Sequence, residues 1–288
     1  MRPSARRHLQ VPIVPTPPDL PVAEAALLVL AEPDPATTGA TLLELAQLGV
    51  LRIDDGVDDR SAQTVVLVDA ALATRRHHRA LLKGLFPLLK PGESRVLRRG
   101  RKDNLRLLGA QSAMTKALYG EVAERGWYRR MPPSGRLGRL LRRTRLVGWG
   151  RLTRAGDETV DEVLGFRRYF ATLEPGQATR AELLGFLPWA MMFGLHERWD
   201  RLAAGVDVDD DEPVAWWSAV GMFRLGRFRR GLAGFTVDVL VADYIYGSGY
   251  TDDGVDPTDI GFDPGNAASG FDGGSAGDGH GGGGGDSW

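Results

Sequence analysis

The chain of 288 residues contains no cysteine. Disulfide frameworks, zinc ribbons, iron–sulfur sites and cysteine nucleophiles are therefore excluded. The sequence also lacks a run of the roughly 18–20 apolar residues that a membrane-spanning helix needs. Its best candidate, residues 183–195, is too short and contains Pro188. We interpret that segment as a buried core helix and expect no transmembrane helix in this chain.

A signal peptide is not expected either, because prolines follow the basic start of the chain where an apolar stretch would be required. These prolines favour an extended arm over residues 1–20. We therefore expect a cytoplasmic protein of bacterial type.

Motifs of catalysis and cofactor binding are missing as well. The sequence has no GxxxxGK[ST] loop, no GxGxxG between a strand and a helix, no HExxH and no GxSxG. The adjacent His77 and His78 should point apart on a helix, and His196 fits an ordinary helix-surface or core-edge role. We expect no enzyme, no cofactor, no metal site and no small-molecule substrate.

What the sequence does contain is a regular order of elements. Helices are predicted over residues 22–31 and 36–48, with Gly49 as a C-terminal cap. Short strands are predicted at 50–53 and 64–69, and the turn-rich residues between them would form a wing. Helix, helix, strand, loop and strand is the order of a winged-helix module.

A similar order recurs further along the chain. A helix over 72–89, a strand over 93–99 and a long helix over 102–125 suggest a second, divergent module, and helical blocks follow at 157–173 and 180–204. The predicted fold is mainly α with small β (α+β), with tandem winged-helix-like units ahead of a helical region. The predicted parts are a proline-rich arm (1–20), two winged-helix-like modules (21–71 and 72–130), a basic linker or interfacial segment (131–156), a helical region (157–246) and a disordered Gly/Asp-rich tail (247–288).

Charge is unevenly distributed along the chain, although the formal net charge is only −1. Residues 75–154 hold 22 basic residues against 4 acidic ones, an excess of 18 positive charges, whereas residues 231–288 hold 10 Asp and no Lys or Arg. Arginine suits bidentate phosphate contacts, but high-GC coding enriches it too. The candidate contacts to an anionic surface are Arg98, Arg99, Arg101, Arg106, Arg136, Arg139, Arg142, Arg143 and Arg145.

A combination of short motifs resembles one known family. In order, these are PPDLP, ATLLELAQLGVLRI, GWY, GFRRYF, LPWAMMFGLHERW and a terminal GGGGGDSW. The chain is similar to the C-terminal, cytosolic half of the predicted membrane proteins that carry Domain of Unknown Function 2207. The resemblance implies a bacterial protein without an established activity. This chain departs from the family's pattern in two ways. The family's ectodomain is missing from it, and an arginine-rich segment at 131–164 replaces the hydrophobic hairpin between GWY and GFRRYF.

These features lead to one expected function and two alternatives. We expect a non-enzymatic scaffold or protein-interaction module, peripheral at the cytoplasmic membrane face, whose partners are a membrane protein or an anionic lipid surface. Residues 136–152 place leucines near one helical face among arginines, as in an interfacial helix. The alternative is a nucleic-acid-binding regulator, but its candidate recognition helix, residues 41–48, has no basic residue and carries Glu44. An enzyme of unrecognised class is the remote alternative.

Overall fold

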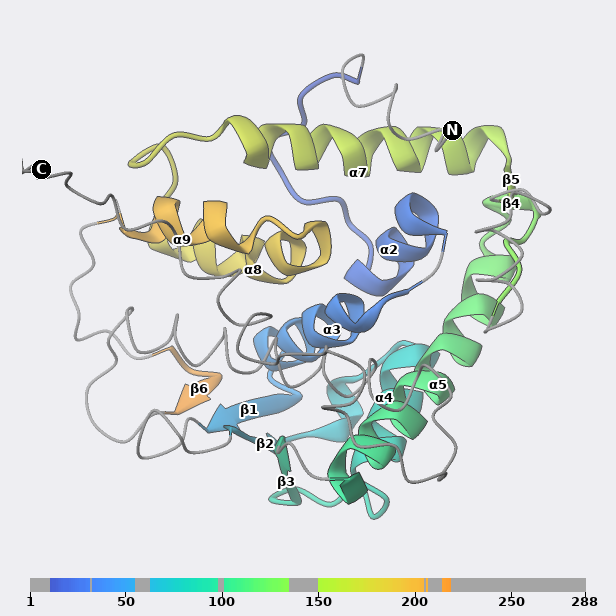
Figure 1. Cartoon of the computed structure of the whole chain (residues 1–288), viewed down its shortest axis with the longest axis vertical. Helices are drawn as coiled ribbons and strands as arrows, with labels where there is room; N and C mark the ends of the chain where they lie inside the picture. The colour runs from blue at the N-terminus through green and yellow to red at the C-terminus, as the bar shows by residue number, and fades with distance from the viewer. Residues whose placement is uncertain are drawn as a thin grey trace, which may run out of the picture. The chain divides into compact units, whose positions relative to one another are not determined.

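The computed structural model describes residues 11–31, 33–54, 63–97, 101–134, 150–204, 206 and 214–218, all within one compact unit that spans residues 1–249. Its architecture is α+β, as the sequence predicts (Figure 1). The α-helices are α2 (Val22–Leu30), α3 (Pro35–Gln47), α4 (Arg76–Leu85), α5 (Arg101–Glu124), α7 (Arg154–Thr172), α8 (Arg180–Phe193) and α9 (His196–Ala204). The strands are β1 (Leu51–Asp54), β2 (Gln63–Leu67), β3 (Ser94–Leu97), β4 (Tyr128–Arg130), β5 (Arg151–Leu152) and β6 (Trp217–Ser218), and a short 3-10 helix, η1, covers Ala70–Leu72.

Helix α3 shows how local sequence sets its own boundaries. The Asp34 side chain accepts a hydrogen bond from the backbone of Thr37, and the Thr37 side chain accepts one from the backbone of Asp34, which forms a capping box ahead of Pro35. At the other end Gly49 adopts a left-handed φ of 75°, as predicted for a C-terminal cap.

The larger sheet joins parts of the chain that the sequence places in separate modules. Its strand order is β3-β2-β1-β6. Strands β1 and β2 belong to the first predicted winged-helix-like module, whereas β3, from the second, pairs antiparallel with β2. Strand β6 pairs parallel with β1 and comes from the region predicted to be helical. Of the predicted wing (54–63), Asp54 and Gln63 belong to β1 and β2, while residues 55–62 and the Gly/Asp-rich tail lie outside the described residues.

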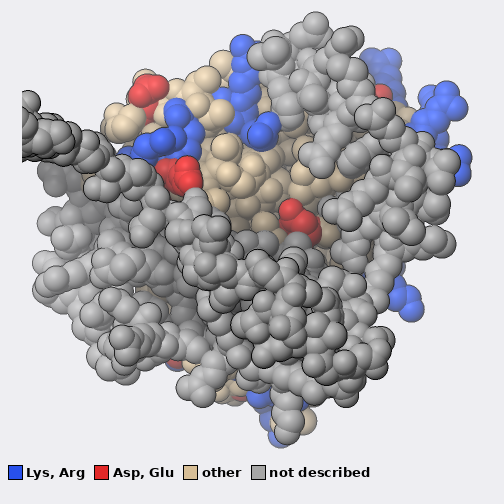
Figure 2. Space-filling view, viewed as in Figure 1, with Lys and Arg blue, Asp and Glu red and all other residues tan. Residues whose placement is uncertain are grey.

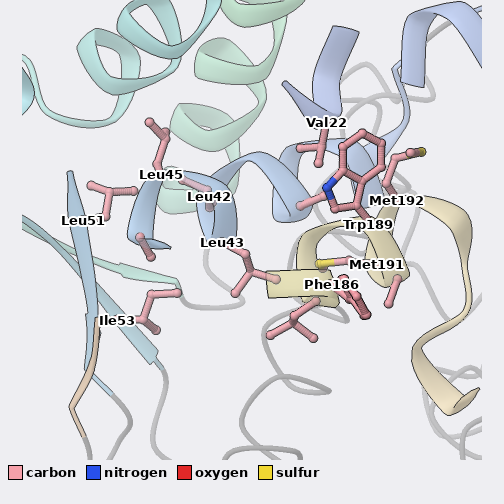
Figure 3. Close-up of a cluster of buried hydrophobic side chains, with 14 of the residues drawn as sticks. Val22, Leu42, Leu43, Leu45, Leu51, Ile53, Phe186, Trp189, Met191 and Met192 are labelled. Carbon is pink, nitrogen blue, oxygen red and sulfur yellow. The ribbon is translucent and has the colours of Figure 1, made fainter. Parts of the chain in front are cut away.

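The hydrophobic core surrounds helix α2, whose residues 22–28 are all buried. Helices α3 and α8 and strand β1 contribute to this core, as Figure 3 shows for Leu43, Ile53 and Trp189. Residues 183–192 of α8 are mostly buried, which confirms the prediction of a core helix there. No helix in the described part of the chain is long and apolar enough to span a bilayer.

Helices α8 and α9 replace the single helical block predicted over residues 180–204. The chain bends at Gly194, which adopts a left-handed φ of 68° at the C-cap of α8. Arg198 of α9 then donates hydrogen bonds to the carbonyl oxygens of Phe170 (2.9 Å) and Leu173 (2.6 Å) at the end of α7. These bonds satisfy carbonyl groups that a helix terminus leaves unpaired.

The proline-rich arm, defined as residues 11–20 of the described chain, packs against α7. Val14 donates a backbone hydrogen bond to the carbonyl of Gly165 (3.3 Å), and Arg168 donates one to the carbonyl of Val11 (2.8 Å). A Cβ atom at Gly165 would lie 2.6 Å from the carbonyl oxygen of Pro12, so the arm can approach only a glycine here.

Candidate functional sites

Of the nine arginines predicted to contact an anionic surface, Arg106 is the one whose side chain the structure describes. It is exposed on helix α5. Arg101 opens the same helix, but its side chain lies outside the described part. The remaining candidates, Arg98, Arg99, Arg136, Arg139, Arg142, Arg143 and Arg145, also fall outside it.

The described chain on either side of the basic residues 135–149 forms a two-stranded ribbon. Strands β4 and β5 pair antiparallel, with Tyr128 opposite Leu152 and Arg130 opposite Arg151 across an irregular register. We call these strands the arginine ribbon, because Arg129, Arg130 and Arg151 are all exposed on it. Figure 2 shows Lys and Arg side chains along the edge where Figure 1 labels β4 and β5. Like charges directly opposite each other in a ladder are destabilising.

The GWY motif holds this ribbon against the core. Tyr128 donates a hydrogen bond to the carbonyl of Leu27 in α2 (2.9 Å), and burial raises the pKa of its hydroxyl. The Thr153 hydroxyl donates a hydrogen bond to the carbonyl of Gly126, and the Thr153 backbone N–H donates one to the carbonyl of Trp127, each at 2.9 Å. Since both strands are anchored, the chain enters and leaves residues 135–149 at neighbouring points.

A second candidate site lies where helices α4 and α5 meet. The Glu121 carboxylate of α5 accepts hydrogen bonds from the backbone N–H groups of Arg76 (2.8 Å) and His77 (2.9 Å), at the start of α4. It also accepts a hydrogen bond from Nδ1 of the His77 ring. A side chain from another helix thus caps α4, because N-terminal N–H groups have no partner within their own helix.

Glu44 of α3 plays the same part for helix α2. Its Oε1 atom accepts a hydrogen bond from the backbone N–H of Val22 (3.2 Å), the first residue of α2. Its Oε2 atom lies 3.2 Å from Nε2 of His78. We call Glu44, His77, His78 and Glu121 the histidine–glutamate cluster. It links four helices, two of them through their N-termini.

The two histidine rings lie together, contrary to the expectation that they point apart. Their centroids are 4.3 Å apart at an interplanar angle of 68°. His77 is fully buried and His78 is 2% exposed. Both face inward with Leu81, Leu82 and Leu85 on the apolar side of α4. That i, i+4 relation was the available sequence signal for their burial, because residues four apart share a helix face.

Burial also decides the charges in this cluster. It lowers the pKa of His77 to about 4; the neighbouring His78 acts in the same direction, and the hydrogen bond to Glu121 opposes both. Burial alone would raise the pKa of Glu121, but hydrogen bonds from the His77 ring and from the backbone of Arg76 and His77 lower it. The pair is therefore a neutral imidazole that donates to a carboxylate.

A buried ion pair lies beside the cluster. Glu24 in α2 is fully buried, and Nη2 of Arg125 lies 3.1 Å from its carboxylate. Burial raises the pKa of Glu24, while Arg125 acts in the opposite direction. The Arg125 guanidinium also lies 5.1 Å from the centroid of the Trp127 ring, a cation–π contact.

Neither a search for metal ligands nor comparison with known proteins adds a further site. Within the described ranges, no group of three or more His, Asp or Glu side chains is placed to hold a metal ion. No protein-family model, curated protein or solved structure matches this chain.

Proposed function

We propose that this chain is a non-enzymatic scaffold that docks peripherally on an anionic membrane surface through its arginine ribbon and the basic segment 131–156. The observation that carries the proposal is the cross-strand pair of Arg130 and Arg151, both exposed. Among the described residues, neither arginine has an ion-pair partner. An anion bound between them would relieve their repulsion, and guanidinium groups bind phosphate in a bidentate manner.

The sequence between the two strands favours lipid as the source of that phosphate. Leu137, Leu140, Leu141 and Val147 lie near one face of a helical projection, among arginines. An apolar face contributes to binding when it enters the acyl boundary of a membrane, whereas it gains little on a nucleic-acid backbone. Each basic residue near an anionic surface contributes about 1 kcal/mol.

Reading of DNA by a winged helix, the alternative, is less well supported. Tandem winged-helix-like units remain our proposal for residues 21–130, on the order of helices and strands. In such a unit α3 would be the recognition helix, yet Leu42, Leu43, Leu45 and Ala46 are fully buried. Gln47 of α3 donates a hydrogen bond to the carbonyl of Leu184 in α8 (2.6 Å). A recognition helix needs one face free for the major groove.

The histidine–glutamate cluster has a structural use within the fold. Its carboxylates are used to cap helices α2 and α4, and the His77 ring donates to one of them. The resemblance to the Domain of Unknown Function 2207 proteins is consistent with a membrane-facing scaffold. That assignment stays a prediction.

Vesicle co-sedimentation of the full chain tests the proposal. Vesicles of phosphatidylcholine alone are compared with vesicles that also contain phosphatidylglycerol. We expect binding to the anionic vesicles only. The double variant Arg130→Glu, Arg151→Glu should weaken it at least thirtyfold, since the loss of two basic contacts removes about 2 kcal/mol.

Lys116→Glu serves as the matched control, because it reverses an exposed charge on α5 away from the ribbon. It should change vesicle binding less than threefold. Equal binding to both vesicle types, or none to either, would refute the lipid proposal. A mobility shift of duplex DNA that the ribbon variant abolishes, without vesicle binding, would favour the nucleic-acid alternative.

A further inference from the structure

The histidine–glutamate cluster is the point at which four helices are fastened to one another. Glu121 joins α5 to the start of α4 through three hydrogen bonds. Glu44 joins α3 to the start of α2, and the His78 ring joins α4 to Glu44. The two histidine rings, 4.3 Å apart, connect one glutamate cap to the other. Any change in the charge of these rings therefore acts on both caps.

The site accommodates His77 in its neutral form. Nδ1 of His77 is bonded to Glu121, while its Nε2 atom is buried without a hydrogen-bond partner. Protonation would place an N–H donor on that atom where no acceptor faces it. A buried polar group without a partner costs about 1–3 kcal/mol, and more when it is charged. The neighbouring His78 ring also opposes protonation of His77.

We infer that the histidine–glutamate cluster is an acid-sensitive lock, in which protonation of His77 releases helix α4 from its cap Glu121 on α5 and from Glu44 on α3. Helices α7, α8 and α9 keep their packing, because the hydrogen bonds described for the cluster join α2, α3, α4 and α5. The device is independent of the membrane proposal and concerns how the fold is held together.

Charged groups on each neighbouring helix surround the histidine pair. Arg75, Arg76 and Arg79 lie on or next to α4, and positive charge there opposes a further proton; Arg75 acts in this way on His77. Glu121 and Glu124 of α5, and Arg125 directly after it, flank the site, with Glu124 paired to Arg76. Glu44 lies on α3 and contacts the His78 ring. Glu24 lies on α2 and forms an ion pair with Arg125. The carboxylates favour protonation, but burial of His77 outweighs them.

The direction of the pH effect follows from the lowered pKa of His77. A histidine whose pKa falls from 6.5 to about 4 on folding contributes stability that is complete above pH 6.5. This contribution is lost as the pH falls toward 4. By pH 5 the equilibrium between closed and open forms should have shifted about thirtyfold toward the open form.

Amide hydrogen exchange of the full chain tests the lock. Protection factors, corrected for the intrinsic pH dependence of exchange, are measured at pH 7.5 and pH 5. We expect protection in residues 76–85 to fall about thirtyfold and protection in residues 180–193 to fall less than threefold. In the double variant His77→Gln, His78→Gln, which cannot titrate, protection of residues 76–85 should change less than threefold. The control His196→Gln, on α9, should behave like the unaltered protein.

Imidazole titration by NMR of the unaltered chain provides a second measurement, which does not depend on the variants folding. The His77 ring should stay neutral at pH 5.5, well below the usual histidine pKa. Three results would overturn the inference: protonation of His77 near pH 6.5, equal loss of protection in residues 76–85 and 180–193, or an unchanged pH response in the double glutamine variant.

Discussion

Replacement of Gly84 by alanine should weaken the packing of helix α4 on helix α5. A Cβ atom at Gly84 would lie 2.6 Å from both the Cα and the Cβ atoms of Ala110 in α5. Carbon atoms in favourable contact are about 3.5–4.0 Å apart. The two helices would therefore have to separate by about 1 Å, along an interface that also carries the Glu121 cap.

The magnitude follows from two opposing effects. Alanine in place of glycine within a helix stabilises by about 0.5–1 kcal/mol. Overpacking of a close contact costs about 1–3 kcal/mol. Since the contact involves backbone as well as side-chain atoms of Ala110, we expect overpacking to dominate. Gly84→Ala should lower the free energy of unfolding by roughly 1–2 kcal/mol.

Gly109→Ala provides a control with the opposite sign. Gly109 lies within α5, next to Ala110, and a Cβ atom there would meet nothing within 4 Å. Its replacement should stabilise the chain by about 0.5–1 kcal/mol. Thermal unfolding followed by circular dichroism measures the stability of both variants. The melting temperature should change by about 2–4 °C per kcal/mol for a chain of this size. Stabilisation by Gly84→Ala would refute the close approach of the helices, and a double variant with Ala110→Gly should recover only part of the loss.

Two further substitutions test contacts made by motif residues. Gly165→Ala should lower the melting temperature by displacing the proline-rich arm, whereas Gly185→Ala, with open space around it, should not lower it. Arg198→Ala removes two hydrogen bonds to carbonyls at the end of α7 and should cost about 1–3 kcal/mol in chemical denaturation. Arg201→Ala, exposed on the same helix, should stay within about 0.5 kcal/mol of the unaltered chain, and equal losses at both positions would contradict the capping role of Arg198.

Local sequence determined most of the individual elements. The capping residues Asp34 and Pro35 and the C-terminal Gly49 delimit helix α3 within two residues of its prediction, because these signals act through neighbouring backbone groups. The long helix predicted over 102–125 corresponds to α5 in the same way. The apolar composition of α8 likewise indicated a core helix.

Long-range contacts could not be foreseen in this way. The predicted modules share one sheet because β3 pairs with β2, and strand β6 joins β1 from a distant part of the chain. Strand pairing depends on which edges meet after folding. Sequence patterns set which face of a strand is buried but do not name its partner.

The candidate sites, too, were predicted from the sequence only in part. The sequence by itself determined that positive charge concentrates in residues 75–154, because charge is a property of composition. Only the tertiary structure placed Arg130 opposite Arg151 and brought Glu121 and Glu44 to the histidines of α4, across 44 and 34 residues of chain. The physical reason is that a carboxylate caps a helix or sets the charge of a ring only within hydrogen-bond distance, and the fold alone creates that distance.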